Sequence, residues 1–279
     1  MKTVVNGTET YLYINGISTT KAIKLHDNIA LLPITSDFHY GRVSDLLEND
    51  VDIAVATVSG RTIASQIRIN AVDARQLACS AWNAAWDCIL LGAIFNCEVM
   101  DSIQCDKPVE QLDNATSVSI TNYAFRAMLS EPYQLTTEDL HWIEANYSAA
   151  YSLLDNDSFM TAAHAMASYK WHSMPRIQLA ILWSGIEALF EASTEITFRI
   201  SLYIANYLSG NDTVKARDIF DRTKKLYASR SVAVHGGKIK GNVEELVSES
   251  ALLLNRIIRR CAETEMLPNT DNLIFPNCN

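Results

Sequence analysis

The stretch LYASRSVAVHGGK, residues 226–238, sets Arg230 and His235 five positions apart, just before the glycine pair 236–237 that predicts a helix end. Arginine carries a permanent charge and a planar fork of donors that matches phosphate oxygens. Histidine titrates near neutral pH and can therefore take up or release a proton. This pair suits cleavage of an RNA phosphodiester by its own 2′-hydroxyl, which needs one proton removed, one donated and charge stabilised at phosphorus. That chemistry requires no metal and no cofactor, so we expect none.

Helix geometry restricts how these two side chains could share one site. Five positions of an unbroken helix turn by about 140°, so Arg230 and His235 would point to different sides. They could meet if the helix frays before Gly236, or if two copies of the motif come together across a dimer axis. The alternative interpretation is an ordinary helix end whose arginine and histidine face solvent.

Three further residues could support the site. Glu187 lies in the apolar segment RIQLAILWSGIEALFEA, where a carboxylate is costly unless it is paired or hydrogen-bonded. It is either half of a structural salt bridge or the group that holds a catalytic arginine or histidine in place. Tyr227 could stack on a base, or pack against a neighbouring helix. Ser231 could form a hydrogen bond to substrate.

The charge distribution favours a local anion site over general binding to nucleic acid. The 279-residue chain has a formal net charge of −9, which argues against coating nucleic acid through an overall positive field. Between Lys215 and Lys240, however, eight basic residues stand against only Asp218 and Asp221. The predicted RNA contacts are Lys224, Lys225, Lys238 and Lys240, although a solvated helix face explains them equally well.

Several function classes find no support in the sequence. It contains no phosphate-binding P-loop, no glycine pattern of a dinucleotide fold, no zinc-protease motif and no C-x-x-C pair. The start of the chain lacks a signal-peptide core, and no run reaches the roughly 18 apolar residues that span a bilayer. We therefore expect a cytoplasmic protein with no membrane partner.

The first part of the chain has mainly β character, and it includes one helix. Strands are predicted in YLYINGI and IALLPI, in SVSITNYAF at 117–125, and on both sides of a Ser59-Gly60 turn within VDIAVATVSGRTIASQIRI. The helix is expected over residues 71–95, with Trp82 and Trp86 in the core.

After Pro132 the apolar pattern becomes helical. Thr136 and Asp139 form a capping box before the first helix, further helices follow at 158–170, from Pro175 and from Thr213, and the last begins at Asn242. The helix after Pro175 is apolar nearly all round, as expected at the centre of a bundle. The fold class is therefore α+β: a β-rich domain over 1–130, a helical bundle over 131–267 and an irregular tail over 268–279.

The segments LWSGIEALF and LYASRSVAVHGGK, together with the final amphipathic helix, resemble the Apea-like branch of the HEPN superfamily. The similarity covers residues 136–265. In that family an arginine, a short spacer and a histidine form the signature, which falls on Arg230 and His235. The residue after the arginine is commonly Asn, Asp or His, where this chain has Ser231.

The resemblance implies an all-α bundle that dimerises so that two Arg/His pairs line a shared cleft, and a metal-independent endoribonuclease of toxin, phage-defence or RNA-processing type. RNA is then the substrate, a second copy of the chain completes the site, and an antitoxin or regulatory protein is a further expected partner. A second function stays open, namely a non-catalytic module that binds RNA or a nucleotide and dimerises.

Overall fold

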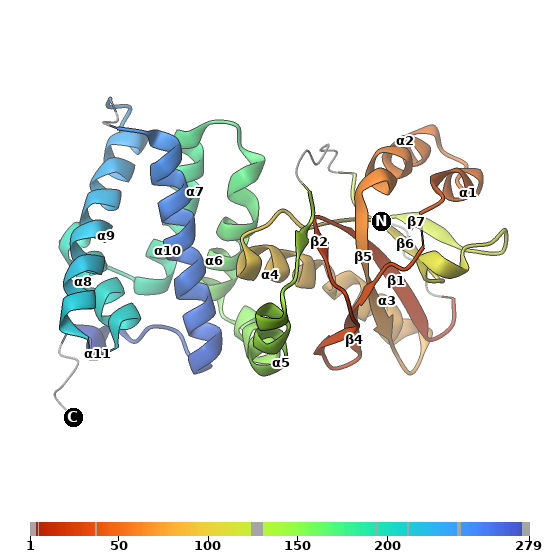
Figure 1. Ribbon diagram of the computed structural model, residues 1–279, viewed down its shortest axis with the longest axis horizontal. Coiled ribbons are helices and arrows are strands. Elements are labelled where there is room, and N and C mark those ends of the chain that lie inside the picture. Colours follow the sequence, from red (N-terminus) through yellow and green to blue (C-terminus); the bar gives the residue numbers. More distant parts are fainter. Residues whose placement is uncertain are drawn as a thin grey trace. The chain divides into compact units, whose positions relative to one another are not determined.

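The computed structural model describes residues 4, 6–36, 38–123, 131–192, 195–210, 212–238 and 241–274. As predicted, the fold is α+β, with a sheet in the first part of the chain and helices in the second (Figure 1). The chain divides into two compact units, Met1–Leu91 with Cys97–Ser148 and Gly92–Asn96 with Ala149–Asn279. The domain boundary that the sequence suggests at residue 130 lies outside the described residues.

The first unit is built on a six-stranded antiparallel sheet of order β3-β4-β5-β1-β6-β7. Its central strand β1 is buried on both faces: Tyr11 and Tyr13 join one apolar cluster, while Leu12 and Ile14 point to the opposite face. The strands are β1 Glu9–Asn15, β3 Ile23–His26, β4 Ile29–Pro33, β5 Ile63–Asn70, β6 Met100–Cys105 and β7 Val118–Ile120. A short parallel pair, β2 Ile17–Ser18 and β8 Tyr133–Gln134, forms a second sheet.

Helices α1 (Tyr40–Asp45) and α2 (Asp50–Ser59) cover the tyrosine face of this sheet. The predicted strand before Ser59-Gly60 is therefore wrong, and no hairpin turn forms there. The Asn49 side chain caps α2 by accepting a hydrogen bond from the Val51 amide. Val55, Ala56 and Ser59 are buried at helical spacing, so packing against the sheet overrides the β-branched composition of the segment.

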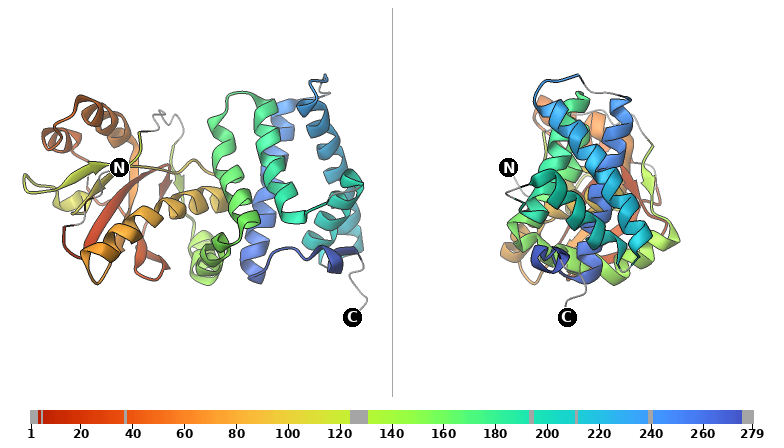
Figure 2. Two further views of the ribbon diagram at one scale, coloured as in Figure 1. Left: turned by 180° about the vertical axis from the view of Figure 1, so that it is seen from behind. Right: turned by 90° about the vertical axis from the view of Figure 1, so that its left-hand side faces the viewer.

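The helix expected over 71–95 is two helices, α3 (Ala74–Asn83) and α4 (Ala85–Phe95), and α3 crosses the other face of the sheet (Figure 2, left). Trp82 is not in the core, because Leu77 and Ala81 form the buried side of α3 and Trp82 is 60% exposed. Trp86 is half-buried. Within the described residues, Ala74–Phe95 is the one stretch long and apolar enough to cross a membrane. Of its most apolar window, 56% is buried within the fold.

The predicted capping box opens the next helix, α5 (Thr137–Ser152). The Thr136 amide donates to the Asp139 carboxylate at 2.9 Å, and the Asp139 amide donates back to the Thr136 hydroxyl at 3.2 Å. The remaining helices are α6 Asp157–Ser168, α7 Pro175–Phe190, α8 Ile196–Ser209, α9 Thr213–Val234, α10 Val243–Thr264 and α11 Thr270–Ile274.

Helix α7 is the central helix of the second unit, as its composition predicts. It packs against α6, α8, α9 and α10 (Figures 1 and 2). Gly185 allows the closest of these approaches, since a Cβ atom there would lie 2.8 Å from the Ala165 Cβ and 3.2 Å from the Ala162 Cα on α6. Pro175 occupies the first turn, where its missing N–H costs no hydrogen bond.

The tail expected to be irregular over 268–279 contains the short helix α11. The Asn269 side chain accepts hydrogen bonds from the amides of Asp271 and Asn272, and the Asn206 side chain of α8 donates to the Leu273 carbonyl at 2.6 Å. These bonds order a segment whose composition alone suggests a loop. Residues 275–279 lie outside the described chain.

Candidate functional site

Arg230 lies on the last two turns of α9 and forms an ion pair with Glu187 of α7. The Arg230 Nη2 atom is 2.9 Å from the Glu187 Oε2 atom, and the two side chains are 19% and 29% exposed. The partner that Glu187 requires is therefore present, and it is the arginine singled out from the sequence. The pair joins the central helix of the bundle to the helix that carries the Arg/His motif.

Arg230 also contacts an aromatic pair, Tyr227 and Trp183, through the Tyr227 ring. The Arg230 guanidinium lies 5.5 Å from the centre of the Tyr227 ring, a cation–π distance. Tyr227 packs edge-on against Trp183 at 5.1 Å, and the Trp183 indole donates to the Ser250 hydroxyl of α10 at 3.1 Å. Tyr227 is only 7% exposed, so it packs within the bundle and does not offer its face to a base.

The charges around Tyr227 act on its hydroxyl. Burial raises the pKa of Tyr227, and the negative charge of Glu187 raises it further, while Arg230 partly opposes the increase. The phenol therefore stays protonated near neutral pH. Glu187 thus binds Arg230 directly and acts on Tyr227 through its charge.

The ion pair does not use all of its hydrogen-bonding atoms. Arginine and carboxylate can form two parallel bonds, but here Arg230 Nε and Glu187 Oε1 are buried without a hydrogen-bond partner within the described structure. A buried donor or acceptor without a partner costs about 1–3 kcal/mol. The guanidinium is consequently oriented by Glu187 but not saturated by it.

His235 ends α9. Its amide still donates to the Ser231 carbonyl at 3.1 Å, and its side chain is exposed. The Gly236 amide donates to the Ala233 carbonyl, and the Gly237 amide donates to the Val232 carbonyl at 2.9 Å. These two hydrogen bonds, with Gly236 at a φ of +75°, form a Schellman motif. The helix is therefore regular up to Val234, and the fraying that would swing His235 back toward Arg230 does not occur.

Arg230 and His235 are accordingly not brought together within one chain. Within the described residues, no hydrogen bond or ion pair joins them. Their positions along α9 differ by about 7.5 Å in axial rise and about 140° in direction. Of the two geometries that the sequence allowed, only the meeting of two copies is compatible with this helix end.

Arg176 is a second arginine at this end of α9, and nothing in its sequence context singles it out as a site residue. It lies in the first turn of α7 and donates to the Ala233 carbonyl at 3.2 Å and to the Gly237 carbonyl at 2.6 Å. A cation at a helix C-terminus is favourable for the helix dipole. The two contacts fix the backbone on both sides of His235. They join residues 57 and 61 positions apart in sequence, a separation that no local pattern reveals.

The other predicted site residues lie on α9 or just after it, and within the described residues only the Ser231 carbonyl, which accepts from the His235 amide, is hydrogen-bonded to the motif. Ser231 is half-buried, and Lys224, Lys225 and Lys238 are exposed. Lys240 lies outside the described residues. The exposure of these lysines is compatible with both interpretations of the sequence, contacts to an RNA backbone and a solvated helix face.

The first unit contains a buried polar network that spacing could not predict. The His26 Nε2 atom is 2.9 Å from the Asp87 Oδ1 atom, and the Tyr147 hydroxyl donates to the same oxygen at 3.0 Å. Burial raises the pKa of Asp87, and its bonds to His26 and Tyr147 lower it. Asp87 is 0% exposed. The network joins α4, α5 and the end of β3, and we assign it a structural role because solvent does not reach the carboxylate.

Within the described residues, no group of three His, Cys, Asp or Glu side chains could hold a metal ion. No protein-family model matches the sequence, and no characterised protein or solved structure is significantly similar to it. The resemblance to the HEPN superfamily therefore stays a prediction from the motif and its neighbouring segments.

Proposed function

We propose that this protein is a metal-independent endoribonuclease of HEPN type that acts as a cytoplasmic homodimer, in a phage-defence or toxin setting. One observation carries the proposal: Arg230 is oriented by Glu187 and Tyr227 on the same helix end that displays an exposed, backbone-fixed His235. A cation and a titratable imidazole, brought together from two copies of this helix end, are the groups that phosphodiester cleavage requires.

The chemistry assigns one role to each side chain. His235 removes the proton from a ribose 2′-hydroxyl, and the oxygen attacks the adjacent phosphorus. Arg230 stabilises the negative charge on the phosphorus oxygens as the bond to the 5′-oxygen breaks. The 5′-oxygen takes up the proton from the His235 imidazolium formed in the first step, and the products are a 2′,3′-cyclic phosphate and a 5′-hydroxyl end.

The helix geometry supports the proposed dimer. Because α9 remains regular to Val234, Arg230 and His235 of one chain diverge in direction. A two-fold axis near the end of α9 would place the arginine of one copy beside the histidine of the other, since a symmetric interface uses the same surface twice. Val232 and Val234, 37% and 47% exposed, provide apolar surface next to the motif for such a contact.

A second candidate function rests on the same ion pair. Arg230 is already paired with Glu187, and the pair contributes to α7–α9 packing whether or not RNA is cleaved. A non-catalytic RNA-binding or nucleotide-binding and dimerisation module would show the same contacts.

Cleavage of a mixed cellular RNA pool by purified wild-type and His235→Ala protein in EDTA distinguishes the two. The ribonuclease predicts new 2′,3′-cyclic phosphate ends with wild type only. Retention of RNA by both proteins without cleavage would contradict the enzyme and favour the binding module. Cleavage by both proteins at the same rate would point to a contaminating nuclease and remove His235 from the mechanism.

A further inference from the structure

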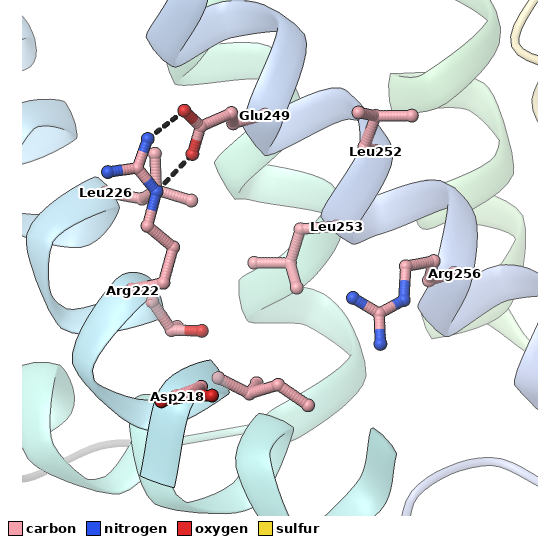
Figure 3. A pocket seen from close by; sticks show the side chains of 9 residues that line it. Asp218, Arg222, Leu226, Glu249, Leu252, Leu253 and Arg256 are labelled. Carbon is pink, nitrogen blue, oxygen red and sulfur yellow. Dashed lines mark hydrogen bonds and ion pairs between the residues drawn. The ribbon is translucent and has the colours of Figure 1, made fainter. Parts of the chain in front are cut away.

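Helices α9 and α10 enclose an apolar pocket that begins at Leu226, one turn before Arg230, and extends away from the Arg/His motif. It has a volume of about 300 Å³, and its walls are mainly aliphatic (Figure 3). Leu226 lines it from α9, and Leu252 and Leu253 line it from α10. Leu252 is 55% exposed, although aliphatic side chains ordinarily pack away from water. The pocket therefore presents a small apolar surface to solvent.

Arginines stand at the rim of this pocket. Arg222 forms a two-pronged ion pair with Glu249, which holds its guanidinium in a fixed plane (Figure 3). Arg256 lines the pocket from α10, two turns after Glu249. A guanidinium held by a carboxylate keeps its flat faces available, and such faces stack on aromatic rings, including nucleobases. Asp218 adds one acceptor at the edge.

A basic pocket of about 380 Å³ adjoins the first one, and Arg256 lines both. Its other charged groups are Lys215, Arg259, Arg260 and Glu263. Arg259 lies 5.9 Å above the Phe95 ring, and within the described residues Lys215, Arg256 and Arg260 form no ion pair with a carboxylate.

Clustering of like charges is unfavourable unless an anion accompanies it. The excess of cations is notable in a chain of net charge −9. The Asp212 side chain already accepts from the amides that open α9, so an anion would bind through the basic side chains and not through the helix N-terminus.

We propose that these two adjoining pockets, the α9–α10 site, bind a nucleoside phosphate, with the base between the leucines and the guanidinium faces and the phosphate among Lys215, Arg256 and Arg260. Neither pocket alone suits both parts of this ligand: the first is mainly apolar, and the second holds most of the cations. Small-molecule pockets span about 300–1,000 Å³, which the two together reach.

The phosphate end of the site is separate from the Arg/His motif, whereas Leu226 at its apolar end lies one turn from Arg230. Lys215 and Arg230 lie 15 positions apart on α9, or about 22 Å along its axis. The ligand is either a free nucleotide or one nucleotide unit of a single-stranded RNA. The inference does not depend on ribonuclease activity, because binding at this site needs neither Arg230 nor His235.

Calorimetric titration tests the site in the full-length His235→Ala protein, which is used so that RNA is not consumed. The probes are AMP, adenosine, inorganic phosphate and an adenine hexanucleotide RNA. We expect AMP to bind more tightly than adenosine or phosphate. Arg256→Gln should weaken AMP binding at least about tenfold, since it removes a charged contact shared by both pockets. Leu252→Ala should weaken it a few-fold through lost apolar contact.

Arg217→Gln is the matched control, because it removes one positive charge, as Arg256→Gln does. Arg217 lies on α9, is 76% exposed and lines neither pocket. Equal weakening of AMP binding by Arg256→Gln and Arg217→Gln would overturn the proposal, as would the absence of binding by both AMP and the hexanucleotide. An Arg256→Gln effect on AMP alone identifies a free nucleotide as the ligand, and a parallel effect on the hexanucleotide identifies RNA. Both of these outcomes leave the question of cleavage to the cyclic-phosphate assay.

Discussion

At the residue scale, the pair of Arg230 and Glu187 combines a structural and a chemical role. Glu187→Gln keeps the size of the side chain but removes the charge that orients the guanidinium. We expect the unfolding free energy to fall by about 1–2 kcal/mol, because a partly buried arginine loses its counter-ion. The cost is moderate because both side chains are partly exposed to solvent, which screens the charge. Under the proposed function the cleavage rate falls as well, with RNA affinity retained.

Chemical denaturation measures the first effect, and single-turnover cleavage measures the second. Glu191→Gln, an exposed position at the C-terminal end of the same helix, is the control and should change stability by less than about 0.5 kcal/mol. If Glu187→Gln is as stable as this control, the ion pair contributes nothing measurable to the packing of α7 on α9.

Asp101 gives the first unit a pH dependence of defined sign. Burial raises the pKa of Asp101 to about 6, and a hydrogen bond from the Cys88 thiol partly opposes the increase. The folded protein therefore binds this proton more tightly than the unfolded chain does. The contribution of Asp101 to stability is complete below the unfolded pKa, near 4, and is lost as the pH rises through about 6.

Asp101→Asn has no charge at any pH and should remove this loss. Relative to wild type, the variant should gain up to about 3 kcal/mol of unfolding free energy between pH 4 and pH 7. Asp113 is the control whose pKa shift has the opposite sign, because the hydrogen bond from Lys107 lowers the pKa of its exposed carboxyl. Denaturation curves for Asp101→Asn that shift with pH as wild type does would show that Asp101 titrates normally.

At the scale of the elements, the sequence predicts helices best where capping and periodicity agree. Thr136 with Asp139, Pro175 and Asn242 each mark a helix start that the structure has. The strand prediction for segment 50–59 is wrong because it rests on the β-branched residues there, whereas burial against the sheet decides such cases. The contacts of Arg176 and of Glu187 with their partners are tertiary. The sequence could indicate only that Glu187 needed a partner, from its apolar neighbours.

Packing of α7 against α6 provides an element-scale test. Gly185→Ala would place a methyl group 2.8 Å from the Ala165 Cβ and 3.2 Å from the α6 backbone, too close for ordinary contact. We expect the two helices to separate at a cost of about 1–3 kcal/mol, despite the better helix propensity of alanine. Thermal unfolding measures the change. Ser184→Ala, at the exposed neighbouring position, should be close to neutral, and equal behaviour of the two variants would mean that α6 adjusts freely.

At the scale of the whole molecule, the net charge of −9 is distributed unevenly, with positive groups along α9 and at the C-terminal half of α10. If RNA is the ligand, it contacts two groups of basic side chains: those of the α9–α10 site, which lie on both helices, and the lysines near Arg230. Binding of a long RNA should then depend more steeply on salt than binding of a mononucleotide, because more counterions are released.

Dimerisation is the whole-molecule property on which the proposed reaction depends, and complementation of two inactive variants tests it. Arg230→Ala and His235→Ala proteins should each be inactive alone. In a mixed dimer, the intact arginine of one chain can meet the intact histidine of the other, so an equimolar mixture should regain up to about a quarter of wild-type cleavage. Light scattering must first establish a dimer, and exchange of a labelled subunit must show that the chains mix. An exchanging but inactive mixture would contradict a site shared between chains, since Arg230 and His235 of a single copy diverge along a regular α9.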